Sequence, residues 1–441
     1  RLSLVGSEMC IRDRGNHQLK ISVTDSQGKV MEVGTYETEA AGGEVYGQLL
    51  VKDVKIPVPT AGGLCRIEAK LCKENSVVTT GYDDILSVNL ASNMLDGKGA
   101  VWEDGSALQN FLKGKTKEAV AAYEDNLGKL DWIMVARPPR KDQLTMVPME
   151  ALRSADGKPG LDVVYYEDME FQKEVYHEVA KVVNLSAIEG ATPSPFVYML
   201  DGYGIKWSGK VLPSVSGEYT IIPQSNDRSM IEVFVNGKKI YEITRKKEHL
   251  GDGKVYLEGG KSADIEIRFR HPRSNARCRL DWAVPNDKMP DAQRLMERAV
   301  NDGTKIFIIQ SADEWSEFIA ANSKAVFKDK FFVGTNWLGG VMFNKPHDIF
   351  KELPVGNALN WPYQALIHTG VERMGLVMEG EELLVGAYHT YPMAIGTAMG
   401  IVPMGKGSVL FSTLYIYGNI INDSAAGLVA KKLIFNMIDF K

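Results

Sequence analysis

Few side chains of this sequence could carry out covalent chemistry, because a nucleophile needs a base beside it. Three thiols and three C-terminal histidines are the first to consider: Cys65, Cys72, Cys278, His347, His368 and His389. The thiols are too scattered for a disulfide framework or a metal-binding knuckle. The sequence contains no Gly-x-Ser-x-Gly, no His-Glu-x-x-His and no phosphate-binding glycine loop. It therefore predicts no catalytic residues of its own.

Carboxylates offer a second route to chemistry, since glycoside cleavage uses two carboxyl groups about 5–10 Å apart across a sugar ring. Acidic residues cluster at Glu167-Asp168 and from Glu379 to Glu382. Neither cluster can be assigned to such a pair, and we interpret both as solvated surface charges.

Other residues have the chemistry of saccharide contact. Amide, carboxylate, guanidinium and aromatic groups occur in predicted loops, at Tyr203, Asn226, Asp227, Arg228, Trp337 and Trp361. We predict these six as carbohydrate-binding residues. For Trp337 and Trp361 the alternative is packing against a catalytic barrel encoded upstream or against a neighbouring subunit. Trp207 and Trp282 are expected in a core.

Composition places the chain among ordinary globular proteins. Its 441 residues suggest about three domains, with 44% hydrophobic and 24% charged residues. A net charge of −5 without a basic cluster argues against a nucleic-acid surface. No apolar run reaches the length of a membrane span. Residues 1–14 resemble a translated sequencing adaptor from a metagenome, so we exclude them and expect the gene to extend upstream.

The chain divides into segments of different pattern. Residues 15–91 read as strands separated by turns, with Leu19, Ile21 and Val23 alternating, and further strands at 48–54, 65–71 and 85–90. This spacing predicts an immunoglobulin-like β-sandwich.

Residues 92–152 and 286–441 carry buried strands that alternate with helices, which is typical of a parallel sheet. Strands are predicted at 99–102, 130–135 and 305–309. Helices are predicted at 106–112, 117–127, 291–300, 312–319 and 425–437. Two strands cannot bury both faces of a sheet, so we expect the two segments to form one α/β domain with a module inserted between them.

The inserted module, 158–285, alternates in the manner of antiparallel strands. Met230 to Val235 is followed by Asn236-Gly237, a strong two-residue hairpin signal, and Ala263 to Phe269 repeats the alternation. A small β-sandwich with long polar loops is predicted.

The order of pieces in this module resembles the protective-antigen (PA-14 type) domain. A Trp-x-Gly strand at Trp207, a Ser-Asn-Asp loop at Asn226-Asp227, a Val-Asn-Gly-Lys hairpin and a closing Asp281-Trp282 carry the resemblance. The resemblance implies a carbohydrate-binding β-sandwich. Some relatives hold Ca²⁺ through two consecutive aspartates; here Asn226 replaces one carboxylate, so Asp227 is the remaining candidate metal ligand, with lowered affinity.

The flanking α/β domain resembles the flavodoxin-like and class I glutamine-amidotransferase-like folds, but lacks the Gly-x-Cys-x-Gly nucleophile elbow. Residues 353–364 and 383–387, with the Gly405-Lys406-Gly407 turn, are similar to the C-terminal region of bacterial glycosidases related to family-2 β-galactosidases.

These resemblances imply a non-catalytic accessory region of a periplasmic or secreted bacterial glycoside hydrolase. Its partners would be a poly- or oligosaccharide, a catalytic barrel encoded upstream in the same chain, and in some cases further copies of itself. Two alternatives stay open for a cofactor: none is bound and Asp227 caps a turn, or Ca²⁺ is bound. The alternative is a cell-surface adhesin or scaffold fragment without hydrolase activity.

Overall fold

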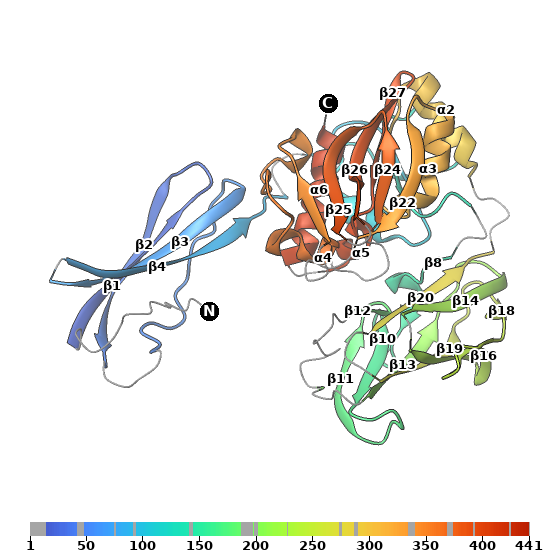
Figure 1. Cartoon of the computed structure of the whole chain (residues 1–441), viewed down its shortest axis with the longest axis horizontal. Coiled ribbons are helices and arrows are strands. Elements are labelled where there is room, and N and C mark those ends of the chain that lie inside the picture. Colours follow the sequence, from blue (N-terminus) through green and yellow to red (C-terminus); the bar gives the residue numbers. More distant parts are fainter. Residues whose placement is uncertain are drawn as a thin grey trace.

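The computed structural model describes residues 15–41, 48–74, 76–90, 94–140, 144–186, 197, 202–226, 228–272, 276–285, 290–333, 340–367, 374–390, 393–422 and 425–440. They form an N-terminal sheet, an α/β domain and a β-sandwich (Figure 1). The α/β domain lies between the other two and contacts both.

The N-terminal sheet is antiparallel and has the strand order β2-β1-β3-β4. Its strands are β1 (Gly15–Thr24), β2 (Val30–Ala40), β3 (Gly63–Lys73) and β4 (Ser76–Ser87). Leu19, Ile21 and Val23 all lie on the buried face, as their alternation predicts.

The second sheet of the predicted immunoglobulin-like sandwich is not confirmed. Residues 48–54, expected to be a strand, have no regular structure. Leu50, Val51 and Val54 nevertheless pack on the apolar face of the sheet. An irregular segment therefore covers this face, and its apolar residues gave the strand-like signal.

Both segments that flank the sandwich contribute strands to the sheet of the α/β domain. Five parallel strands lie side by side: β6 (Ala121–Ala122), β5 (Gly99–Glu103), β7 (Trp132–Ala136), β21 (Lys305–Ile308) and β27 (Gly407–Ser412). Numbered along the chain, their order is 2-1-3-4-5, which also occurs in flavodoxin-like sheets. The closer amidotransferase-like assignment stays a prediction.

Antiparallel strands extend the sheet beyond β27. They are β22 (Val326–Phe332), β23 (Val341–Asn344), β24 (Met374–Glu379), β25 (Glu382–Thr390) and β26 (Met393–Met404). The tight turn predicted at Gly405-Lys406-Gly407 joins β26 to β27.

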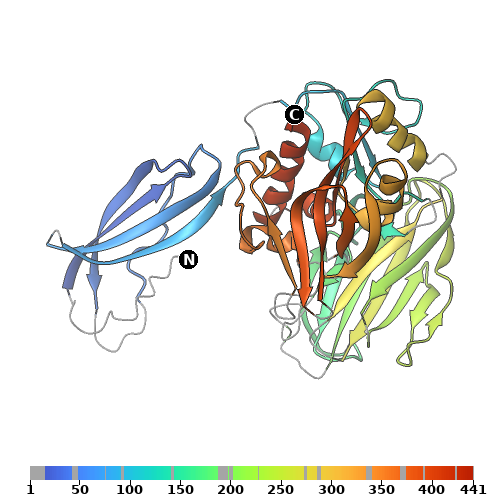
Figure 2. The same ribbon diagram turned by 45° about the horizontal axis from the view of Figure 1, so that its top comes forward.

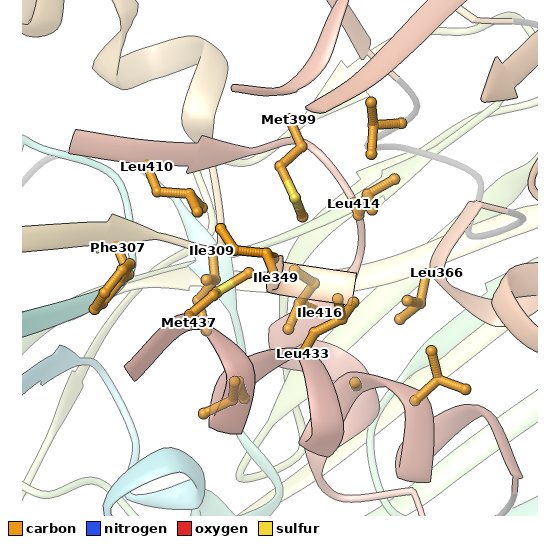
Figure 3. Close-up of a cluster of buried hydrophobic side chains, with 14 of the residues drawn as sticks. Phe307, Ile309, Ile349, Leu366, Met399, Leu410, Leu414, Ile416, Leu433 and Met437 are labelled. Carbon is orange, nitrogen blue, oxygen red and sulfur yellow. The ribbon is translucent and has the colours of Figure 1, made fainter. Parts of the chain in front are cut away.

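Helices cover both faces of the parallel strands, which are apolar on both sides. Trp132 and Met134 of β7 face one core, and Ile133 and Val135 face the other. The first core is covered by α1 (Ala107–Leu112), α5 (Ile416–Ile420) and α6 (Ala425–Asp439), and the second by α2 (Ala292–Asp302) and α3 (Ala312–Ala321). Figure 3 shows side chains of the first core gathered between the sheet and α6.

Shorter helical turns complete the first side: η3 (Asp348–Phe350), η4 (Trp361–Tyr363) and α4 (Gln364–Ile367). Two predictions for the helices need correction. The helix expected at 117–127 is wrong, because this stretch contributes the edge strand β6. In α6 the apolar residues at helical spacing, Leu428, Leu433, Ile434 and Met437, predict a docking face. Leu433, Ile434 and Met437 are buried, but Leu428 is exposed.

The sandwich consists of two antiparallel sheets. One contains β9 (Leu152–Arg153), β10 (Leu161–Tyr166), β11 (Glu174–Ala180), β13 (Tyr203–Val211), β15 (Met230–Val235), β16 (Lys238–Ile243), β17 (His249–Leu250) and β19 (Ala263–His271). The other contains β8 (Thr145–Met146), β12 (Asn184–Ser186), β14 (Gly217–Ser225), β18 (Lys254–Leu257) and β20 (Arg277–Ala283).

The core of the sandwich follows the alternation of its strands. Trp207 and Trp282 are buried in it, as predicted. Asn236 and Gly237 have φ of 49° and 75° and form the two-residue loop between β15 and β16. The hairpin predicted from this pair is confirmed, because both loop positions need the left-handed conformation that Asn and Gly tolerate.

A buried ion pair lies where the sandwich joins the α/β sheet. Arg137 follows β7, is 5% exposed and pairs with Asp104, which follows β5. The other oxygen of Asp104 accepts a hydrogen bond from the Thr145 hydroxyl at 2.6 Å, and Thr145 belongs to β8 of the sandwich. Figure 2 shows the sandwich packed along the α/β domain.

We expect removal of Asp104 to destabilise the chain strongly. Asp104→Ala leaves the Arg137 guanidinium buried without its carboxylate, which costs about 3–5 kcal/mol in comparable pairs. Asp84→Ala is the matched control, since Asp84 pairs with Arg66 at 2.7 Å with half of the Arg66 side chain exposed. Exposed pairs contribute about 0–1 kcal/mol. Urea unfolding followed by circular dichroism measures both, and equal losses would contradict the prediction.

Candidate functional site

A cationic cavity lies at one end of the larger sheet of the sandwich. Its volume is about 650 Å³, and its charged lining is dominated by four cations, Arg228, Arg245, Lys247 and Arg270. The apolar part of the wall comes from Met169, Met230 and Pro272. We call these residues, with Glu170, the basic pocket.

The strand register explains why these residues meet. The β15–β16 loop at Asn236-Gly237 places the start of β15 and the end of β16 together at the opposite end of the hairpin. Arg228 precedes β15, and Arg245 follows β16. β19 pairs with β15 so that Arg270 lies opposite Met230. Residues distant in sequence therefore surround one opening.

Arg270 forms the rigid floor of the basic pocket. Its Nε donates to the Met169 carbonyl at 3.0 Å, and a terminal nitrogen donates to the Glu232 carboxylate, also at 3.0 Å. The guanidinium lies 4.5 Å from the centroid of the Phe171 ring. Such contacts fix the plane of a guanidinium and leave it oriented for a ligand.

The charge of Glu232 is balanced by its neighbours. Partial burial acts to raise the pKa of Glu232, but hydrogen bonds and charge from Arg270 and Lys239 outweigh it, so its pKa lies below the usual value. Arg228 and Arg245, by contrast, are exposed and form no ion pair with any residue that the structure describes. The basic pocket therefore has unneutralised positive charge at its rim.

The predicted site residues are not all brought together. Arg228 lines the basic pocket. Asn226 lies beside it in the same loop, where its Oδ1 accepts from the Arg277 backbone N–H at 2.9 Å and from the Ser229 hydroxyl at 3.4 Å. Asp227 and Trp337 lie outside the described residues.

The prediction that Tyr203 contacts saccharide is wrong. Its side chain is 0% exposed and lies in the sandwich core beside Phe269, so it offers no surface to a ligand. Burial raises its pKa, and its hydroxyl has no hydrogen-bond partner among the described residues. Tyr203 is the first residue of β13, and from the sequence alone a residue at the start of a strand cannot be told from a residue at the end of a loop.

Trp361 is 49% exposed but belongs to the α/β domain. It borders a smaller cavity of about 170 Å³ that Asn357, Asn360 and Asp84 also line. Asp84 comes from the N-terminal sheet. Trp361 therefore lies at the contact between the N-terminal sheet and the α/β domain, apart from the sandwich.

The loop at Asn226 does not fit a calcium site. A Ca²⁺ ion needs several oxygen ligands with free lone pairs, and the Asn226 oxygen already accepts two hydrogen bonds. The cations of the basic pocket add unfavourable charge. Within the described part of the chain, no three His, Cys, Asp or Glu residues are grouped so that they could hold a metal ion.

Sequence reasoning missed Arg245, Lys247 and Arg270 and expected no basic cluster. One signal was present in the sequence, the run of three consecutive cations Arg245-Lys246-Lys247. Arg270 gave no signal, because it lies within an alternating strand and reaches the pocket only through the pairing of β19 with β15.

One curated protein is similar in sequence to part of this chain. A stretch of 127 residues is 28% identical to the anti-sigma-I factor RsgI3 of Acetivibrio thermocellus and covers 28% of this chain and 19% of that protein. The chain thus spans about a fifth of the curated relative that it matches.

Two solved structures show weaker similarity. A β-glucosidase from Kluyveromyces marxianus is 12% identical with a TM-score of 0.35, over 50% of this chain and 29% of that one. A PA14 sugar-binding domain from an RTX adhesin is 15% identical with a TM-score of 0.21, over 28% of this chain and 88% of that one. The PA14 domain family itself matches residues 157–294. The β-sandwich that carries the basic pocket is therefore a PA14 domain.

Proposed function

We propose that this chain binds carbohydrate through its PA14 domain, and that the ligand is a saccharide carrying carboxylate or sulfate groups. The observation that carries the proposal is the set of four cations around the basic pocket. The resemblance to PA14 domains implies carbohydrate binding. The cations of the basic pocket suit saccharides that carry carboxylate or sulfate groups.

Guanidinium groups suit this ligand class. They bind planar carboxylates and sulfates through two parallel hydrogen bonds. Arg270 is held in place by Met169 and Glu232, while Arg228 and Arg245 have free donors at the rim. Met169, Met230 and Pro272 give an apolar wall against which the C–H face of a sugar ring can pack.

The wider role we propose is an accessory region of a secreted glycoside hydrolase, which holds polysaccharide for a catalytic domain in the same chain. The proposal includes association of several copies into a homo-oligomer. Support comes from the PA14 domain and from the sequence similarity of residues 353–364 to glycosidase C-terminal regions. None of the described helices is long and apolar enough to cross a membrane.

The alternative role is a cell-surface adhesin or scaffold. The complete reading frame distinguishes the two. A β/α barrel with two glutamates at strand ends supports the hydrolase, and further sandwich repeats support the adhesin.

We expect the full chain to bind trigalacturonate or a sulfated carrageenan tetrasaccharide, and to bind neutral maltotriose far more weakly. The double variant Arg228→Ala/Arg245→Ala should weaken binding of the charged saccharides roughly 10- to 100-fold, because it removes two charge-assisted contacts that are partly screened by water. Isothermal titration calorimetry measures the affinities.

Lys238→Ala is the matched control, since Lys238 is an exposed cation at the other end of the same β15–β16 hairpin. It should leave binding unchanged. Affinity should also fall as salt rises, because exposed charges are screened. Equal affinity for neutral and charged saccharides, or no effect of the double variant, would refute the proposed ligand class.

Binding should not depend on calcium. The Asn226 side-chain oxygen already accepts two hydrogen bonds, so it has no lone pair left to coordinate Ca²⁺. We expect the dissociation constant for trigalacturonate to be the same in two parallel titrations, one with Ca²⁺ and one with EDTA. A loss of binding in EDTA that added Ca²⁺ restores would show that a metal site involving Asp227 exists.

A further inference from the structure

A second cavity, of about 290 Å³, lies between the sandwich and the α/β domain. On the α/β side it is lined by residues that directly follow the parallel strands: Pro138 after β7, Gln310 after β21 and Leu414 after β27. In open α/β sheets, ligands bind in the crevice outside the carboxyl ends of the strands. The sandwich closes this crevice from the other side. We call it the interdomain cavity.

Gln310 has a buried oxygen without a partner. The residue is 7% exposed, and its Oε1 has no hydrogen-bond partner within the described part of the chain. Such an atom loses its hydration without compensation unless something else donates to it. Because Gln310 lines the interdomain cavity, a ligand in the cavity can supply this donor.

Ser311 adds a strained backbone and a hydroxyl that does not cap α3. It lies between β21 and α3 with φ of 54° and ψ of 35°, the left-handed region that non-glycine residues rarely adopt. Although Ser311 occupies the N-cap position, its side chain makes no capping hydrogen bond. Ala312 and Asp313 also line the cavity, and their backbone N–H groups belong to the first turn of the ten-residue helix α3, which has no partner within the helix for them.

This strand-to-helix turn has the backbone form of a nucleophile elbow. A serine nucleophile needs a base to take its proton. Among the described residues that line the interdomain cavity there is no histidine, and Asp281 is held by Arg279. The arrangement therefore favours binding over covalent catalysis.

The charges of the cavity disfavour an anion. From the sandwich, Arg279 binds Asp281 through two contacts of 2.8 Å, so these two charges cancel. On α3, the Asp313 carboxylate accepts from Lys330 at 2.8 Å, and Glu314 adds a further carboxylate. A neutral ligand that offers hydroxyl donors to Gln310 and accepts from the start of α3 fits this set of groups.

We infer that the interdomain cavity binds a neutral polyhydroxyl molecule of about the size of a monosaccharide. Gln310 and Ser311 hold it from the α/β side, and Gln224 of β14 lines the sandwich side. This site is separate from the basic pocket and does not depend on the proposed function.

The test uses the full chain with D-glucose, D-galactose and D-xylose as probes, each up to about 50 mM, which covers affinities weaker than about 1 mM. Saturation-transfer NMR measures binding, and thermal unfolding measures stabilisation by the sugar. We expect at least one of the three to bind, and Gln310→Leu to weaken that binding at least tenfold. Gln293→Leu, an amide on α2 that pairs with Asn322 away from the cavity, is the matched control and should bind like the unmodified chain.

Folding of the variant can be separated from loss of the site. The Gln310 oxygen bonds no described residue, so Gln310→Leu should unfold at an unchanged or higher temperature without sugar. If it unfolds earlier, Gln224→Leu tests the opposite wall with the same expected loss. The double variant Arg228→Ala/Arg245→Ala should retain full binding of the neutral sugar.

Three results would overturn the inference: none of the sugars binds, the variants in the cavity bind as tightly as the unmodified chain, or binding is lost in the Arg228→Ala/Arg245→Ala variant. The last result would assign the neutral sugar to the basic pocket.

Discussion

The buried ion pair of Arg137 and Asp104 fixes the position at which the chain passes from the α/β domain into the sandwich. β7 ends at Ala136, and the next residue carries a guanidinium that is almost completely removed from water. Burial lowers the pKa of Arg137, and the charge of Asp104 opposes that effect. Because a buried cation is tolerated only with its counterion, Arg137 must stay beside β5. The indole N–H of Trp315 also donates to the Arg137 carbonyl at 2.8 Å, which ties α3 to the same point.

This constraint places the sandwich over the carboxyl ends of the parallel strands and divides its polar surface into two kinds. The end that carries Arg228 and Arg245 has positive charge open to water, and neither residue is paired with any residue that the structure describes. The side that faces the α/β domain has Arg279 and Asp281 bound to each other. Desolvation explains the difference, since charges at a domain contact must be paired, whereas charges at a solvent-facing rim need not be. One small domain therefore has two different polar surfaces, which we propose bind an anionic saccharide and a neutral ligand, respectively.

The sequence predicted best those features that depend on local periodicity. The alternation at Leu19, Ile21 and Val23, the Asn236-Gly237 hairpin and the helix that ends at Gly303 with φ of 78° all follow from residues near one another. Local pattern failed where tertiary contact decides. Residues 117–127 have helical composition, yet Ala121–Ala122 is recruited as an edge strand by β5.

Of the predicted site residues that the structure describes, only Arg228 lines the basic pocket. Arg270 reaches that pocket through strand register, and Tyr203 left the predicted set because the register of β13 turns it inward. Neither fact is encoded in residue type or local spacing. Gln310 and Ser311 are similar: an ordinary polar pair in sequence, they become notable only because a strand ends there and a second domain covers them.

The insertion of the sandwich between β7 and α2 has a mechanical consequence. The chain crosses from the α/β domain to the sandwich after Ala136 and returns before Ala292. A force applied to a ligand bound by the sandwich would thus be shared by two covalent connections. One connection leads to β7 and the other, through α2, to β21, and these two strands are neighbours in one sheet. A module attached at a single terminus would instead transmit the whole force through one peptide strand.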